Sequence, residues 1–238
     1  MADDLQELLG RARCVLFDFD GPMCRLFAGH PASAVAQELR DLLNTRGASG
    51  LLSPEEERSD DPYRVLSAVD RAAPGDPLVA EIEERLTDGE LRAVDEATPT
   101  PYANELVRAL VLAGRKVGVT TNNSPAAVER YLRAHGLDGH FAGHVYGRTG
   151  RPVLLKPHPD CVNRALAGMG AGPEEAVMIG DAAGDLMAAT DAKVGFIGYA
   201  RNERKAAQLR DARADVVVRS LRDVLTAGHW DAAGPPGA

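Results

Sequence analysis

From residue 98 onward, short apolar segments alternate with segments that carry the periodicity of an amphipathic helix. We expect strands at 116–121, 141–147, 176–180, 193–198 and 214–218. Helices are expected between and after them, at about 102–113, 124–136, 159–170, 183–192, 202–212 and 220–225. Apolar strands that are separated by helices favour a parallel sheet covered by helices on both faces. The apolar run at 14–17 has strand length and belongs to the same sheet, so the pattern predicts an α/β protein with a Rossmann-like parallel sheet.

The segment between this first strand and residue 98 has a different character. Residues 25–97 carry helical periodicity, for instance at Leu39, Leu66 and Ile82, and show no strand pattern. The sequence TPTPY then marks a linker that leads into the start of a helix. We therefore expect one α/β core, formed by residues 1–24 and 98–238, which a helical domain at 25–97 interrupts after the first strand.

Polar side chains follow three of the predicted strands and precede one helix. They are Asp18 and Asp20, Thr120 to Asn122, Asp181 and Asp185, and Lys156. Ligands of parallel α/β sheets sit at the carboxyl ends of the strands, so these side chains are expected to meet. Two carboxylates about 4 Å apart repel by roughly 4 kcal/mol at an effective dielectric constant of 20, so the aspartates need a cation. Ligands that are all oxygen favour Mg²⁺.

Charge and composition disfavour several classes of function. The 238 residues carry a formal net charge of −8, which disfavours nucleic-acid binding. No apolar run approaches the roughly 18 residues that span a bilayer, and the N-terminus lacks the basic start and apolar stretch of a signal peptide. Three scattered cysteines, Cys14, Cys24 and Cys161, indicate free thiols. We therefore expect a cytoplasmic protein that binds neither nucleic acid nor membrane, and the sequence leaves its oligomeric state open.

The order of these motifs resembles that of the haloacid dehalogenase-like (HAD) hydrolase superfamily. DFDG at 18–21, the pair Thr121-Asn122, Lys156 and GDAAGD at 180–185 follow one another in that order. The helical segment between the first two motifs resembles the C1 cap of the superfamily. The resemblance implies a Mg²⁺-dependent phosphatase that acts on a small phosphorylated metabolite, such as a phosphosugar, phosphoglycolate or a nucleotide. A sugar phosphomutase with the same core, and a binding protein that keeps the fold without the activity, are the alternatives.

The resemblance implies a role for each aspartate of the first motif. Asp18 would be the nucleophile that forms an aspartyl-phosphate. Asp20 would be the general acid that protonates the leaving group and then the base that activates water. Since side chains alternate along a strand, both carboxylates are expected on one face and the rings of Phe17 and Phe19 on the other.

The metal ligands and the lysine are likewise implied by the resemblance. Asp18, the backbone carbonyl of Asp20, and Asp181 would bind Mg²⁺, and Asp185 would orient a metal-bound water or Lys156. Lys156 would neutralise charge on the phosphate and the nucleophile. The chain contains only four lysines and many arginines, so a lysine here suggests a need for a compact ammonium group.

The remaining motif residues would surround the phosphate. Thr121 would bind a phosphoryl oxygen through its hydroxyl and N–H, although Thr120 also fits this register. Asn122 follows as the second residue of the Thr-Asn pair and is expected to contact substrate. Gly21 is expected to let the chain turn sharply beside the substrate, and Pro22 departs from the Thr or Val usual in the family.

Residues at the junction between core and cap are expected to frame the substrate. Arg25, Phe27 and His30, in the sequence CRLFAGH, lie where the chain leaves the core. In the superfamily this junction contributes to substrate binding, so the three are candidates for that role. A hinge motion at this junction and at 98–101 would close the cap over the substrate.

Two other groups of residues fit a site less well. Glycines separate His135, His140 and His144, which disfavours a zinc site on a single helix. Arg148 and Arg151 follow the third predicted strand of the core, and a solvated loop is the favoured interpretation for both.

Overall fold

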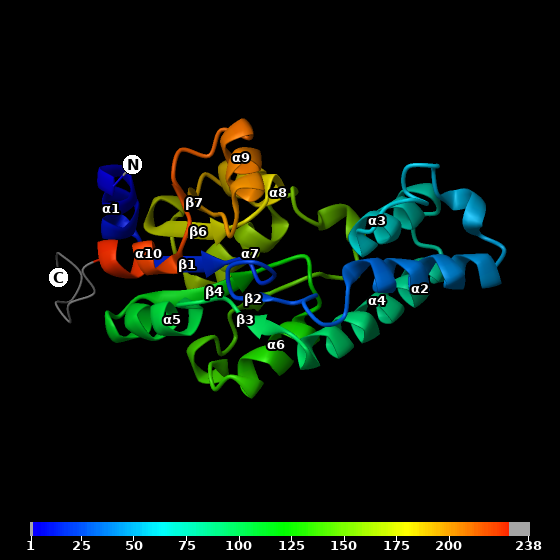
Figure 1. Cartoon of the computed structure of the whole chain (residues 1–238), viewed down its shortest axis with the longest axis horizontal. Coiled ribbons are helices and arrows are strands. Elements are labelled where there is room, and N and C mark those ends of the chain that lie inside the picture. The colour runs from blue at the N-terminus through cyan, green and yellow to red at the C-terminus, as the bar shows by residue number, and fades with distance from the viewer. Residues whose placement is uncertain (1, 229–238) are drawn as a thin grey trace.

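A computed structural model, which describes residues 2–228, contains a six-stranded sheet whose neighbouring strands all run parallel (Figure 1). The order across the sheet is β5-β4-β1-β6-β7-β8. The strands are β1 (Cys14–Phe17), β4 (Lys116–Thr120), β5 (Val145–Tyr146), β6 (Ala176–Gly180), β7 (Gly195–Tyr199) and β8 (Val217–Val218). The predicted α/β parallel sheet is confirmed. The strands expected at 141–147 and 214–218 are shorter than predicted.

Helices cover both faces of the sheet because apolar side chains alternate along the strands. Val15 and Phe17 face one apolar cluster, and Cys14 and Leu16 face the other. The first cluster is closed by α1 (Ala2–Arg11), α5 (Ala103–Leu112), α6 (Pro125–Ala134) and α10 (Leu221–Ala227). The second is closed by α7 (Asp160–Met169), α8 (Ala183–Asp191) and α9 (Glu203–Asp211).

Between β1 and α5 the chain forms a helical insert, which lies to one side of the sheet in Figure 1. Its helices are α2 (Ala32–Thr45), the 3-10 turn η1 (Ser49–Leu51), α3 (Pro62–Ala72) and α4 (Pro77–Asp95). The insert has an apolar cluster of its own, which includes Leu39, Leu66 and Ile82. The expectation that 25–97 contains no strand is wrong at its first residue. Arg25 belongs to β2 (Cys24–Arg25), which pairs antiparallel with β3 (Thr98–Pro99).

Local sequence signals define several helix starts. Asp61, Asp76 and Ser124 cap α3, α4 and α6, and each is followed by proline. The hydroxyl of Ser124 accepts the N–H of Ala127 at the start of the helix that was expected at 124–136. The other 3-10 turns are η2 (Asp138–His140), η3 (Pro152–Leu154) and η4 (Pro173–Glu175). No helix in the described part of the chain is both long enough and apolar enough to cross a bilayer.

Candidate active site

Three neighbouring strands bring the predicted site residues together. Strands β4 and β6 pair with the two sides of β1, and Phe17 lies opposite Val119 and Ile179. Asp18, Thr121 and Asp181 follow the ends of these strands. Because the strands are parallel, their carboxyl ends lie at the same edge of the sheet, as expected. Phe17 and Phe19 both lie in one apolar cluster, which agrees with the predicted alternation.

Lys156 connects the first and last motifs. Its Nζ donates to Asp18 Oδ1 at 2.8 Å, to Asp185 Oδ1 at 2.6 Å and to the carbonyl of Thr120 at 3.0 Å. An ammonium group has three N–H donors, so these contacts use all of them. The Lys156 side chain is 5% exposed, and a planar guanidinium would not match three acceptors placed around one nitrogen.

Burial and nearby charges shift the pKa of Lys156 in opposite directions. Burial alone would lower the pKa of Lys156, but the carboxylates of Asp18 and Asp185 outweigh it and raise the pKa. Burial, with the nearby charge of Asp185, raises the pKa of Asp18, and Lys156 opposes that rise. The ammonium group therefore stays charged, and Asp18 gains from any further cation placed beside it.

Asp185 and Asp181 have different surroundings. Asp185 Oδ2 accepts the N–H groups of Asp181 and Ala182, both at 3.0 Å, at the start of α8. Its other oxygen accepts Lys156 Nζ, and the two roles expected for Asp185 stay predictions. Asp181 Oδ2 instead pairs with Lys205 Nζ at 2.9 Å. Sequence reasoning did not identify Lys205, although the scarcity of lysine that marked Lys156 applies to it equally.

The cluster of aspartates can hold a metal ion. Asp18, Asp181 and Asp185 each offer a carboxylate oxygen, and these oxygens lie within 4.8 Å of one another. A donor set made only of oxygen fits a hard divalent cation rather than zinc. The carboxylate of Asp20 does not belong to this group, and the role expected for its backbone carbonyl stays a prediction.

Asp20 lies beside the cluster, in the segment between β1 and β2. Its Oδ1 accepts the N–H of Leu26 at 2.9 Å. Burial raises the pKa of Asp20 to about 6, although the N–H of Leu26 opposes the rise. Gly21 comes next, with φ of +130°, and a Cβ there would lie 2.6 Å from Asp181 Cγ. Both the backbone conformation and the close approach therefore require glycine.

The second motif is held by internal hydrogen bonds. The hydroxyl of Thr121 donates to Asn123 Oδ1 at 2.8 Å, and its N–H donates to the carbonyl of Tyr146 at 3.2 Å. The hydroxyl of Thr120 is buried and has no partner among the described residues. Asn122 Oδ1 accepts the N–H of Lys156 at 2.7 Å, and Asn122 Nδ2 donates to the carbonyl of the same residue. Asn122 therefore positions the lysine, whereas phosphate binding by either threonine stays a prediction.

The three candidates at the junction occupy different environments. Arg25 is exposed and Phe27 is half-buried, and both line a cavity of about 280 Å³ that also contains Asp20 and Asp181. Phe27 packs against the apolar cluster of the insert and against one cluster of the core. His30 is half-buried and does not line this cavity, and its Nε2 has no hydrogen-bond partner in the part of the chain that the structure describes.

The expectation that Arg148 lies in a solvated loop is wrong. Its side chain is 1% exposed, and Nη1 donates to Glu90 Oε1 at 2.9 Å and to the carbonyl of Asn122 at 3.0 Å. Glu90, in α4 of the insert, is fully buried and also accepts from Tyr63, Asn123 and Ser124. This network joins the insert to the loop that follows β4.

A signal for Glu90 is present in the sequence. It lies four residues after Leu86 and four before Val94, on the apolar face of a predicted helix. An acid at such a position needs a buried partner. The identity of that partner depends on the tertiary fold.

Comparison with known proteins agrees with this geometry. A family model described as haloacid dehalogenase-like hydrolase matches residues 12–193. That range includes all the motifs and the insert, so the chain belongs to the haloacid dehalogenase-like hydrolases.

Individual relatives match only about half of this chain, at about 30% identity. Pyrophosphatase PpaX of Bacillus cereus is 31% identical over 121 residues, which are 51% of this chain and 55% of the relative. A phosphoglycolate phosphatase of Nitrosococcus oceani is 30% identical over 124 residues, 52% of this chain and 54% of the relative. These matches span about half the length of the relatives. The crystal structure of a "predicted phosphatase" from Clostridium acetobutylicum shares the fold, with a TM-score of 0.67, 18% identity, and coverage of 90% of this chain and 96% of that one.

Proposed function

We propose that this chain is a Mg²⁺-dependent phosphatase that hydrolyses a small phosphorylated metabolite through an aspartyl-phosphate on Asp18. The observation that carries the proposal is the convergence of Asp18, Lys156, Asp181 and Asp185 at the carboxyl ends of β1 and β6. The names of the relatives, a pyrophosphatase and a phosphoglycolate phosphatase, support the class of substrate. We place the protein in the cytoplasm because its three cysteines are unpaired.

The side chains would act in two steps. Lys156 binds Asp18 Oδ1, which leaves Oδ2 to attack phosphorus. The bond from phosphorus to the ester oxygen breaks, and Asp20 gives its proton to that oxygen. Asp20 then takes a proton from water, the water oxygen attacks phosphorus, and the bond to Asp18 breaks to release phosphate.

The carboxylates of Asp18, Asp181 and Asp185 would hold the metal ion directly or through water. Bound there, Mg²⁺ supplies positive charge that offsets the crowded carboxylates and the charge on the phosphoryl oxygens. Lys156 would add to that charge, since Asp185 binds its ammonium group and Asn122 holds its backbone.

The proposal is tested by measuring hydrolysis of p-nitrophenyl phosphate in Mg²⁺ and in excess EDTA. Activity should disappear in EDTA and return when Mg²⁺ is added. Asp18→Asn should abolish turnover, since no covalent intermediate can form. Asp191→Asn, an exposed aspartate at the end of α8, is the matched control and should change nothing. Full activity in EDTA, or turnover by Asp18→Asn, contradicts the mechanism. The alternative function, a phosphomutase, would transfer phosphate within a sugar phosphate without releasing it.

A further inference from the structure

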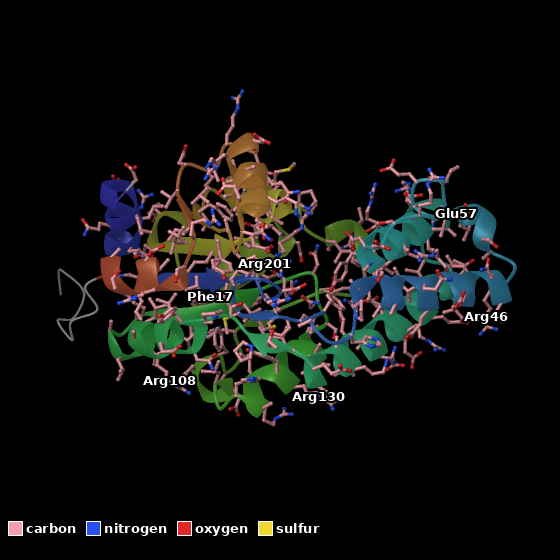
Figure 2. All side chains as sticks on the ribbon, viewed as in Figure 1. Phe17, Arg46, Glu57, Arg108, Arg130 and Arg201 are labelled. Atoms are coloured by element: carbon pink, nitrogen blue, oxygen red, sulfur yellow. The ribbon has the colours of Figure 1, made fainter. Side chains whose placement is uncertain are left out.

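Two cavities meet beside the candidate general acid. The first, of about 280 Å³, contains Asp20 and Asp181 together with the cationic side chains of Arg25, Arg201 and Lys205. The second, of about 570 Å³, shares Gly21, Arg25 and Arg201 with the first. Arg25 and Arg201 therefore line both hollows. Figure 2 shows Arg201 near the middle of the molecule, on the side of the sheet that faces the insert.

The two arginines come from distant parts of the chain. Arg25 lies in β2, where the chain enters the insert, and Arg201 lies in the loop between β7 and α9. Within residues 4–228, neither guanidinium forms a side-chain hydrogen bond or an ion pair. Lys205 differs, because it binds Asp181. Each of the two arginines therefore keeps all five of its N–H donors for a ligand.

The balance of charges in the site suggests a role for these arginines. Asp18, Asp20, Asp181 and Asp185 outnumber the two buried or half-buried lysines that contact them, Lys156 and Lys205. A metal ion in the cluster would offset that excess. Among the described residues, the two guanidinium groups then remain as cations without an ion-pair partner, in the same cavity as Asp20 and Asp181.

We infer that Arg25 and Arg201 form a subsite for a second anionic group of the substrate. The natural substrate is then a small phosphate monoester that also carries a carboxylate or another phosphate. Planar guanidinium groups bind either oxyanion through paired, charge-assisted hydrogen bonds. The inference rests on the proposed phosphatase activity, and it extends the role of Arg25 from general substrate contact to recognition of a particular chemical group.

Matched substrates test the inference. Phosphoglycolate carries a carboxylate where ethyl phosphate carries a methyl group, and propane-1,3-diol bisphosphate carries a second phosphate that propyl phosphate lacks. Wild-type protein should hydrolyse at least one doubly anionic substrate with a kcat/KM well above that of its partner. Arg25→Ala and Arg201→Ala should each lower that kcat/KM by roughly tenfold to a hundredfold, chiefly through KM, and should change the singly anionic substrates by less than about threefold.

Controls separate this subsite from general effects. Arg204→Ala removes an exposed arginine of α9 that lines neither cavity, and it should leave all four substrates unaffected. Arg25 and Arg201 are exposed, and within the described residues their side chains form no hydrogen bond or ion pair, so both variants should keep the wild-type melting temperature. The pair of substrates that responds identifies the second group as carboxylate or phosphate.

Binding to an inactive protein separates failure of the subsite from failure of the proposed function. Asp18→Asn is titrated calorimetrically with the same four compounds, and phosphoglycolate or the bisphosphate should bind more tightly than its partner. Adding Arg201→Ala should remove that preference. Equal binding of both members of each pair, or equal losses on both in the kinetic assay, overturns the subsite. Absence of any hydrolysis by wild-type protein, with the binding preference intact, overturns the phosphatase proposal alone.

Discussion

Replacing Arg148 by methionine is expected to destabilise the folded protein, because it leaves a carboxylate in the interior without its cation. Glu90 is fully buried and Arg148 is 1% exposed at the side chain. Removing one partner of a buried ion pair costs about 3–5 kcal/mol. Glu90 keeps neutral donors from Tyr63, Asn123 and Ser124, so we expect the lower end of that range, about 3 kcal/mol.

Urea unfolding followed by circular dichroism measures the loss, as a lower midpoint at an unchanged slope. Arg130→Met is the matched control, since Arg130 pairs with Asp95 at 2.7 Å with both side chains about half exposed. That variant should lose 1 kcal/mol or less. The double variant Arg148→Met/Glu90→Gln removes both charges and should be more stable than Arg148→Met alone.

Two results would refute the reasoning. One is a loss for Arg148→Met no larger than that for Arg130→Met, which would mean that the buried pair behaves like a surface pair. The other is a double variant no more stable than the single one, which would mean that the stranded charge of Glu90 is not the source of the cost.

Three further predictions concern the turn, the acid and the insert. Gly21→Ala should destabilise the protein by about 1 kcal/mol or more and slow hydrolysis, because φ is +130° and the new Cβ would meet Asp181; wild-type stability and rate together would contradict this. Asp20→Asn should slow hydrolysis of an alkyl phosphate by roughly 10²–10⁴-fold and hydrolysis of p-nitrophenyl phosphate by less, since nitrophenolate leaves without a proton. Equal losses on both substrates would indicate that Asp20 has only a structural role. The pKa of Glu56 is lowered to about 2, chiefly because its carboxylate accepts the N–H of Ser53. A carboxyl with a lowered pKa stabilises the fold above its unfolded pKa and loses that effect as pH falls toward 2, so wild type and Glu56→Gln should differ in urea midpoint at pH 6 and converge at pH 2.

The sheet and the site aspartates could be predicted because both depend on local patterns. Apolar runs followed by helices define a parallel sheet, and a parallel sheet gathers its strand ends at one edge. Asp18 and Asp181 follow two adjacent strands, so the chain order of their motifs was enough to expect them together. Lys156 lies in a loop, so the strand pattern alone said little about it, and its role was implied only by the resemblance.

The contacts between core and insert could not be predicted in the same way. Strands β2 and β3 have two residues each, too few to show a period of two. The ion pair of Glu90 and Arg148 joins residues 58 positions apart. Taken alone, Glu90 is an acid on a helix and Arg148 is an arginine in a loop. They become partners only because α4 packs against the core, beside α6.

The pairing of β2 with β3 has a consequence for how such a chain can evolve. Cys24 lies opposite Pro99 and Arg25 opposite Thr98, so the chain leaves the core and returns to it at a single point. Thr100 fastens this point by donating its N–H to the carbonyl of Met23. A gene that exchanged everything between the two strands for an unrelated segment would leave the path of the six-stranded sheet unaltered. The segment between the two strands could therefore be replaced as a whole during evolution while Asp18, Asp181 and Asp185 stay together in the core.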